Sequence, residues 1–261
     1  MKRIIYIYIL IFALLYSCVE NRELSFNGLH TEPGYFVECY LIPGEAYRLS
    51  ATKLQPLYED YILDYSLEFD VKIDTLNLKH GLFKQNDTYY HYNYGHPSHF
   101  RPKRAALTHL HVCTPDNDTI TASTTIPEQV HLFNTQFQNN EIKFDFILSA
   151  ESWHNYYMIN INAQHIDTLV RKNRFLDYSD IDFEDTVSFK YNFIANGDLK
   201  KLKVVLRRVT RANYDYQISM QNAKDANRDN LVLPSPLAGN LKNATGIFTC
   251  FTCDSVVWKW K

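Results

Sequence analysis

Three side chains that could bind a metal ion alternate along one expected strand. His109, His111 and Cys113 are each separated by one residue, so a strand places them on one face, and His96 and His99 precede them. Imidazole and thiolate ligands suit zinc or copper. A complete metal site needs further ligands from elsewhere in the chain. The alternative interpretation is that these side chains belong to a solvated or packed face of the strand. We expect no bound metal or other cofactor, and these three residues are the candidates if a metal binds.

A cysteine pair near the C-terminus has the spacing of a redox site. Cys250 and Cys253 are separated by two residues. A reactive pair owes its low thiolate pKa to a helix N-terminus, whereas Phe248 and Phe251 indicate a strand here, and Asp254 is adjacent. We therefore expect a structural bridge or two unreactive thiols.

The sequence contains none of the common hydrolytic motifs: a nucleophile elbow, a zinc-hydrolase helix or a phosphate-binding loop. Ser152 and His154 bring a hydroxyl near an imidazole, but a catalytic triad also needs a third member in space. We expect that the protein is not an enzyme.

The most unusual segment is rich in tyrosine. Tyr89, Tyr90, Tyr92, Tyr94 and His96 fall within eight consecutive residues. Tyrosine supplies apolar area with a polar tip, so these residues predict a contact surface for a partner or ligand. The alternative is a twisted edge hairpin whose rings pack on their own sheet.

The N-terminus has the organisation of a signal peptide. Lys2 and Arg3 precede an apolar run that is too short to span a bilayer. Leu15 and Ser17 stand before Cys18 as in a lipoprotein cleavage site, and acylation of Cys18 would give lasting membrane attachment. The alternative is an ordinary signal peptide with an incidental cysteine.

Composition indicates a globular protein. Hydrophobic residues make up 46% and aromatic residues 15% of the 261 residues, which favours strands and a substantial core. The net charge of −2 gives no basic field for nucleic acid. Outside the reducing cytosol, Cys39, Cys113, Cys250 and Cys253 can form disulfides or remain buried thiols.

Short runs with alternating apolar residues predict an all-β protein. The expected strands are 36–42, 47–50, 67–74, 110–112, 119–126, 142–148, 157–161, 202–206, 246–251 and 256–260. One short helix is expected over 213–223, capped by Asn213. We predict a signal peptide (1–17), a tether (18–30) and two Ig-like β-sandwich modules (31–127 and 128–261), joined near Pro127, with the helix in the second.

Several segments together resemble a known family. They are Cys18-Val19-Glu20, the strand 36–42, the strand 120–127, Asn155-Tyr156-Tyr157, and 236–240 with 246–248. This pattern resembles the Bacteroidota outer-membrane lipoproteins of domain of unknown function 4249, which are encoded beside TonB-dependent transporters. The resemblance implies a noncatalytic accessory lipoprotein that works with a large β-barrel partner. It brings no catalytic residues.

A second resemblance is to the O-glycosylation signal of that phylum, an Asp followed by Ser or Thr and then an apolar residue or Thr. The hydroxyl residues in matching positions are Thr75, Thr119, Thr168, Thr186 and Ser255. The alternative is turn chemistry, because Asp and Thr commonly end turns before an apolar strand residue.

These observations lead to an expected function. We expect an outer-membrane lipoprotein that faces the cell exterior, since Glu20 and Glu23 behind Cys18 are similar to acidic surface-export signals. Its expected partner is a TonB-dependent transporter or another outer-membrane β-barrel complex. The alternative is a stand-alone carbohydrate- or peptide-binding surface lipoprotein that uses the tyrosine-rich segment.

Overall fold

The computed structural model describes residues 34–54, 68–85, 88–102, 106–181, 183–193, 198–226, 228 and 236–260. Side chains of residues 82–91 are outside this description. Pro33–Lys261 form one compact unit. The leader, Cys18 and the predicted tether lie outside the described residues.

The first hairpin is formed as predicted. Strands β1 (Tyr35–Leu41) and β2 (Ala46–Lys53) pair in antiparallel fashion. Side chains of β1 alternate between buried and half-buried, so one face enters a core. The turn between them uses Gly44 at a φ of 86°, a conformation that glycine adopts without strain.

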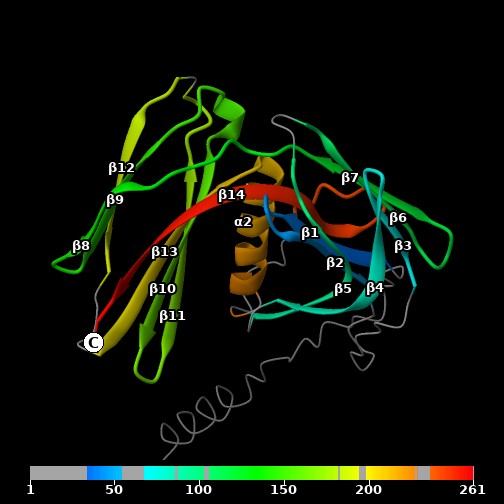
Figure 1. Ribbon diagram of the computed structural model, residues 1–261, viewed down its shortest axis with the longest axis horizontal. Coiled ribbons are helices and arrows are strands. Elements are labelled where there is room, and N and C mark those ends of the chain that lie inside the picture. Colours follow the sequence, from blue (N-terminus) through cyan, green and yellow to red (C-terminus); the bar gives the residue numbers. More distant parts are fainter. Residues whose placement is uncertain are drawn as a thin grey trace, which may run out of the picture. The chain divides into compact units, whose positions relative to one another are not determined.

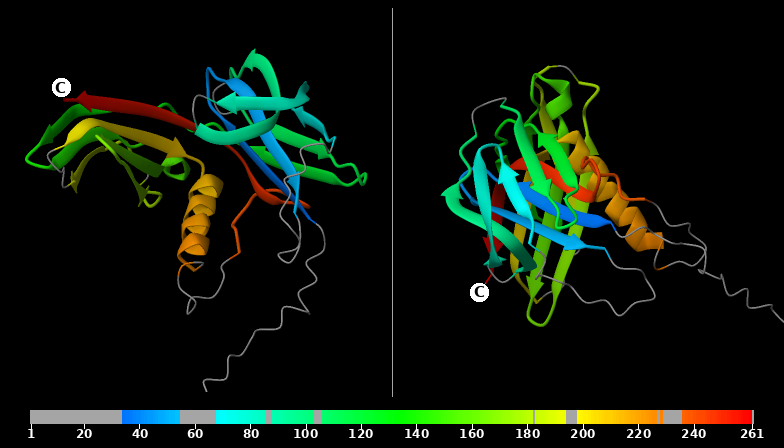
Figure 2. Two further views of the ribbon diagram at one scale, coloured as in Figure 1. Left: turned by 90° about the horizontal axis from the view of Figure 1, so that it is seen from below. Right: turned by 90° about the vertical axis from the view of Figure 1, so that its right-hand side faces the viewer.

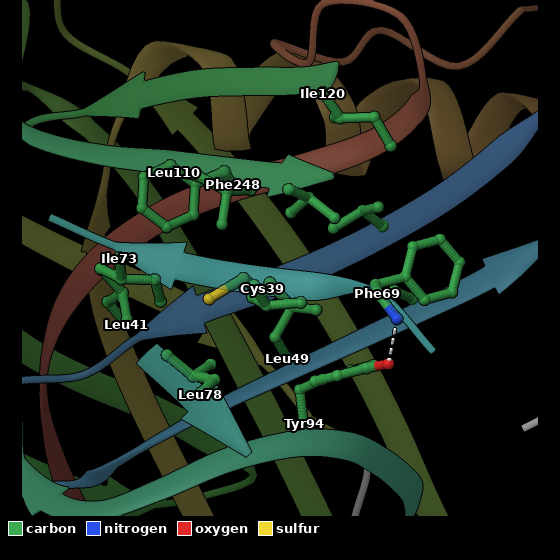
Figure 3. Packing of buried hydrophobic residues seen from close by; sticks show 14 of the residues in the cluster. Cys39, Leu41, Leu49, Phe69, Ile73, Leu78, Tyr94, Leu110, Ile120 and Phe248 are labelled. Atoms are coloured by element: carbon green, nitrogen blue, oxygen red, sulfur yellow. Dashed lines mark hydrogen bonds between the residues drawn. The ribbon is translucent and has the colours of Figure 1, made fainter. Parts of the chain in front are cut away.

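Five further strands complete the first half of the chain. They are β3 (Asp70–Ile73), β4 (Leu76–Gln85), β5 (Thr88–His99), β6 (Thr108–Cys113) and β7 (Thr119–Thr124). Apolar side chains from all seven strands and from the last strand of the chain form one core (Figure 3).

The second half is a sandwich of two sheets. Its strands are β8 (Phe133–Gln138), β9 (Glu141–Ile147), β10 (Tyr156–His165), β11 (Leu169–Asp177), β12 (Thr186–Asn192) and β13 (Leu199–Val209), with the 3-10 turn η1 (Ser152–His154) before β10. The sheet β12-β9-β8 packs against β11, β10 and β13 across a second core.

One long strand joins both halves. Strand β14 (Thr245–Lys259) pairs in parallel with β1 through Cys250 and in antiparallel fashion with β13 from Phe251 onward (Figure 1). The resulting sheet has the order β11-β10-β13-β14-β1-β2-β5-β4-β3-β6-β7. The prediction of two separate final strands is wrong, because the polar stretch between them keeps its pairing to β13.

The helix begins earlier than predicted. Helix α2 spans Arg211–Ala226 and follows directly from β13 (Figure 2). Its cap is Thr210, whose Oγ1 accepts a hydrogen bond from the backbone N–H of Asn213 at 3.2 Å. Asn213, the predicted cap, is therefore a buried residue of the first turn. Tyr216 fixes the helix to β1 by donating a hydrogen bond to Glu38 Oε1 at 2.7 Å.

The described chain is thus an all-β, sandwich-like protein with one α-helix, as the sequence predicts. Phe248 and Cys250 of β14 belong to the first core, while Val256 and Trp258 pack against the second. The division into modules near Pro127 stays a prediction. Among the described residues, no helix has the length and apolar character needed to cross a membrane.

Replacement of Gly246 tests how much the β1–β14 pairing contributes to stability. It has a φ of 121°, and a Cβ atom there would come within 2.0 Å of the Val37 carbonyl oxygen. We expect Gly246→Ala to lower the free energy of unfolding by about 3 kcal/mol or more, because both the backbone conformation and the strand contact are lost. Urea unfolding measures this change.

The matched control is Gly44→Ala. Gly44 also has a positive φ, but a Cβ atom there meets nothing within 4 Å. We expect this control to cost only about 1 kcal/mol. Equal losses for the two variants would contradict the role assigned to the close contact.

Candidate functional site: a pocket beside helix α2

A pocket of about 250 Å³ lies beside the first turn of α2. Its walls come from the end of β7, from η1, from the start of α2 and from two loop residues. The lining residues are Leu107, Ser123, Thr124, Thr125, Trp153, His154, Thr210, Arg211, Ala212 and Asn240.

Apolar side chains form one wall. Trp153 is 47% exposed and Leu107 is 51% exposed, which is unusual for large apolar groups. The imidazole of buried His154 lies against the indole, with ring centroids 3.5 Å apart. An exposed indole beside an aliphatic side chain provides a stacking platform for a flat apolar ligand face.

Polar groups form the other walls. Asn240 is fully used by the fold: its Nδ2 donates to the carbonyl oxygens of Ser123 and Phe248, and its Oδ1 accepts from the Phe248 N–H. Arg211 is 76% exposed and its Nε lies 3.6 Å from Asp215. The hydroxyls of Ser123, Thr124 and Thr125, together with this guanidinium, are the groups that could bind a polar ligand.

The segment that carries Trp153 is clamped by Asn155. This buried side chain accepts hydrogen bonds from the Ser149 N–H at 2.8 Å and the Tyr157 hydroxyl at 2.9 Å, and donates to the Ser149 carbonyl at 2.9 Å. Both ends of the segment between β9 and β10 are therefore fixed to each other. The clamp holds the indole in position before any ligand binds.

A buried arginine connects this clamp to β13. Arg208 is 3% exposed and donates through Nη2 to the Ile147 carbonyl at 2.6 Å and to the Tyr157 hydroxyl at 2.8 Å. Burial raises the pKa of Tyr157, and the positive charge of Arg208 opposes that rise. Glu128, 3.8 Å from Arg208, accepts a hydrogen bond from Ser149 Oγ at 2.8 Å. This network gives a buried charge the partners that it needs.

Sequence reasoning did not identify this pocket. The sequence indicated Ser152 and His154 only as a hydroxyl near an imidazole. The structure places the Glu151 carboxylate 3.6 Å from His154 Nδ1 and the His154 ring against Trp153. The signal that could have indicated the site is a tryptophan in a loop between two strands, because such residues are usually buried or functional.

The metal candidates share one face, as predicted. His109 and His111 are exposed and Cys113 is half-buried on β6. The Cys113 Sγ atom lies 3.9 Å from His111 Nδ1. Within the described residues, however, no group of three or more His, Cys, Asp or Glu side chains is close enough to hold a metal ion.

The tyrosine-rich segment lies inside the sheet. Strand β5 pairs with β2 and β4, so it is not the edge hairpin that was the alternative. Tyr94 is 1% exposed, and its hydroxyl accepts a hydrogen bond from the Phe69 N–H at 2.7 Å (Figure 3). The prediction that Tyr94 contacts a partner is wrong, because its ring is part of the core. Tyr92 and His96 are half-buried, and the side chains of Tyr89 and Tyr90 lie outside the described part.

The described cysteines are free thiols. Cys250 is buried and Cys253 is exposed, since the strand places them on opposite faces, so they form no bridge with each other. Burial raises the pKa of Cys250 to about 12 and also raises that of Cys39. Neither core thiol is therefore a nucleophile at neutral pH.

The five hydroxyl residues of the glycosylation signal are all exposed: Thr75, Thr119, Thr168, Thr186 and Ser255. Exposure is necessary for modification, and glycosylation of these residues stays a proposal.

The chain belongs to the family described as domain of unknown function (DUF4249), whose model matches residues 22–255. None of the curated proteins compared with the chain matches it.

Accessibility of the thiols can be measured directly. We expect iodoacetamide to modify Cys253 in the native protein, while Cys39 and Cys250 react only after denaturation, because the core excludes the reagent. Mass spectrometry of the digested protein identifies each modified site. A mass deficit that disappears on reduction would reveal a disulfide and contradict the free-thiol assignment.

Proposed function

We propose that this protein is a noncatalytic lipoprotein, anchored by lipid on Cys18 in the outer membrane, that acts as an accessory subunit of a β-barrel complex such as a TonB-dependent transporter. The observation that carries the proposal is the order of its parts. A short apolar leader ends at Leu15, Ser17 and Cys18, and the compact unit begins only at Pro33.

The segment between Cys18 and the β body would limit the distance between the body and the membrane. Residues 19–32 could span at most roughly 50 Å when fully extended. The β body would thus remain close to the membrane surface, where a barrel partner is available. Tethering of this kind raises the effective concentration of the body at a membrane-embedded partner, so a modest contact surface is enough for a stable complex.

Docking explains the character of the body better than catalysis does. Its most elaborate polar network, around Arg208, Tyr157 and Asn155, holds a loop in place with each of these side chains engaged by hydrogen bonds. The two buried thiols have raised pKa values, which lowers their reactivity. These features suit a rigid scaffold that presents fixed surfaces.

Replacement of the anchor residue tests the proposal. We expect Cys18→Ser to move the protein from the membrane fraction to the soluble fraction, because the acyl chains on Cys18 are lost. The control is Cys253→Ser, which removes an exposed thiol from the body and should leave the protein in the membrane fraction. Fractionation followed by immunoblotting measures the distribution.

Two further measurements address the partner and the orientation. Purification of the wild-type protein in mild detergent should recover a stoichiometric β-barrel protein, and protease added to intact cells should cut the body if it faces outward. Retention of Cys18→Ser in the membrane, or purification of the wild-type protein alone, would refute the anchored-subunit proposal.

The pocket favours a second candidate function, a stand-alone carbohydrate-binding lipoprotein. Tyr94 is buried and cannot contact a ligand, but Trp153 has an exposed indole with hydroxyls of β7 nearby. Sugar rings present an apolar face that stacks on indole and hydroxyl edges that form hydrogen bonds.

Trp153→Ala tests this candidate. Loss of the stacking platform should weaken binding of a glycan by roughly two- to tenfold, since a ring contact contributes about 0.5–1.5 kcal/mol. Trp260→Ala, which changes an exposed tryptophan at the chain end, is the control. Screening on a glycan array, followed by calorimetry, measures the affinities. Equal affinities for the two variants would exclude the pocket as the sugar site.

A further inference from the structure

The outer surface of the sheet formed by β11, β10, β13 and β14 carries a group of basic side chains. Leu202 and Val204 are buried in the second core, so the alternating Lys201 and Lys203 point away from it. The same alternation applies to the neighbouring strands. We call this surface the basic face, and its charged residues are Arg171 of β11, Lys201 and Lys203 of β13, and Lys259 of β14.

Uncharged residues fill the positions between these charges. Lys201 pairs with Gln164, and Lys203 pairs with Asn162, which in turn pairs with Arg171. The other outward residues around them are Asn160, Asn173, Ser255 and Val257. Asp254 of β14 pairs with Leu206 and so lies on the side of the second core, where it accepts a hydrogen bond from the Leu132 N–H. The other acidic residues of these strands and turns lie at the ends: Asp177 ends β11, Asp167 follows β10, and Asp198 precedes β13, 2.9 Å from His165 Nδ1.

The arrangement is unfavourable for the isolated protein. Lys201 and Lys259 are directly opposite each other on neighbouring strands, and like charges in that position destabilise a sheet. Within the described residues, none of the four basic residues forms an ion pair. A surface that keeps uncompensated repulsion fits an anionic partner that removes it.

The opposite sheet of the same sandwich lacks this bias. Its outward residues on β9 and β12 include Glu141 and Asp145 as well as Lys143 and Lys190. Lys143 and Lys190 are also directly opposite each other, but Glu141 and Asp145 occupy the neighbouring outward positions on β9 and balance their charge. Of the two sheets of this sandwich, only the one with the basic face therefore carries a positive excess, in a chain whose net charge is −2.

Exposed apolar side chains accompany the charges at one end of the basic face. Ile166 is 61% exposed, Leu169 51% and Val257 40%. The register of the strands brings Leu169 into the same row as Gln164, Lys201 and Lys259. The turn between β10 and β11 and the end of β14 lie at the same end of the sheet (Figure 1). Basic residues beside exposed aliphatic side chains are typical of surfaces that rest on lipid.

We propose that the basic face binds the anionic surface of a membrane, with Lys201, Lys203, Arg171 and Lys259 contacting phosphate-bearing headgroups and Leu169 and Val257 entering the interface. The proposal rests on the lipid-anchored function above, because the anchor holds the body next to that surface. An open sheet face with charges spread over three strands matches a surface of many headgroups better than a single enclosed anion.

The test uses the chain without residues 1–17 and with Cys18→Ser, so that no acyl chain contributes. Binding is measured by co-sedimentation with phosphatidylcholine vesicles that contain either no anionic lipid or one third phosphatidylglycerol. We expect binding to the anionic vesicles only, with weakening at high salt. Lys201→Gln with Lys203→Gln should reduce the affinity roughly tenfold or more, because each basic residue at an anionic surface contributes separately.

The matched control is Lys143→Gln with Lys190→Gln, which makes the same change in charge on the opposite sheet and should bind as the parent does. Circular dichroism melts confirm that both double variants are folded. Absence of binding by the parent chain, or equal binding by the two double variants, would overturn the proposal. Unchanged vesicle binding together with loss of a co-purified barrel protein from the anchored Lys201→Gln and Lys203→Gln variant would assign the face to a protein instead.

Failure of the membrane-binding proposal can be distinguished from failure of the lipid-anchor proposal. The vesicle assay contains no lipid anchor, so it can fail while Cys18→Ser still releases the protein from membranes. Conversely, the anchor can prove unnecessary while the isolated body still binds anionic vesicles.

Discussion

The parallel pairing of β14 with β1 is the contact on which the rest of the structure depends. Thr245 to Cys250 lie beside Phe36 to Leu41 in regular register, and the same strand then continues along β13. The close approach is possible only because Gly246 has no side chain: a Cβ atom there would overlap the Val37 carbonyl. One continuous strand therefore carries hydrogen bonds from the first core to the second, and both cores contribute to a single sheet.

Strand β14 positions both the pocket beside α2 and the basic face. Asn240 of the pocket is hydrogen-bonded to both backbone groups of Phe248 on β14, and α2, which forms the opposite wall, leaves from β13 next to it. Thr210 at the helix start also contacts Thr249 at 2.9 Å through their hydroxyls. Lys259, at the far end of the same strand, belongs to the basic face. A rigid connection between pocket and basic face follows from backbone pairing rather than from a flexible linker.

Local features of the fold could be predicted from the sequence, and long-range ones could not. Alternating side chains and a Pro-Gly turn identified the hairpin of β1 and β2, and the alternation of Ile142, Phe144 and Phe146 identified β9. Parallel pairing between the first and last strands leaves no local pattern, so β14 was divided in two at its polar middle. Tyr94 was assigned to a surface because tyrosine-rich composition does not reveal which strand has neighbours on both sides. The pocket and the basic face each combine side chains from several elements, which only the three-dimensional arrangement brings together.

The central claim, that β14 makes one cooperative body of two cores, has a direct measurement. All three tryptophans, Trp153, Trp258 and Trp260, lie in the second half, whereas Cys39 and Cys250 are buried in the first core. Urea unfolding can therefore be followed by tryptophan fluorescence for one core and by the extent of thiol alkylation for the other. Coincident transitions are predicted, because the shared strand cannot leave one core while it stays paired in the other. Two separated midpoints would contradict the account and indicate independent modules.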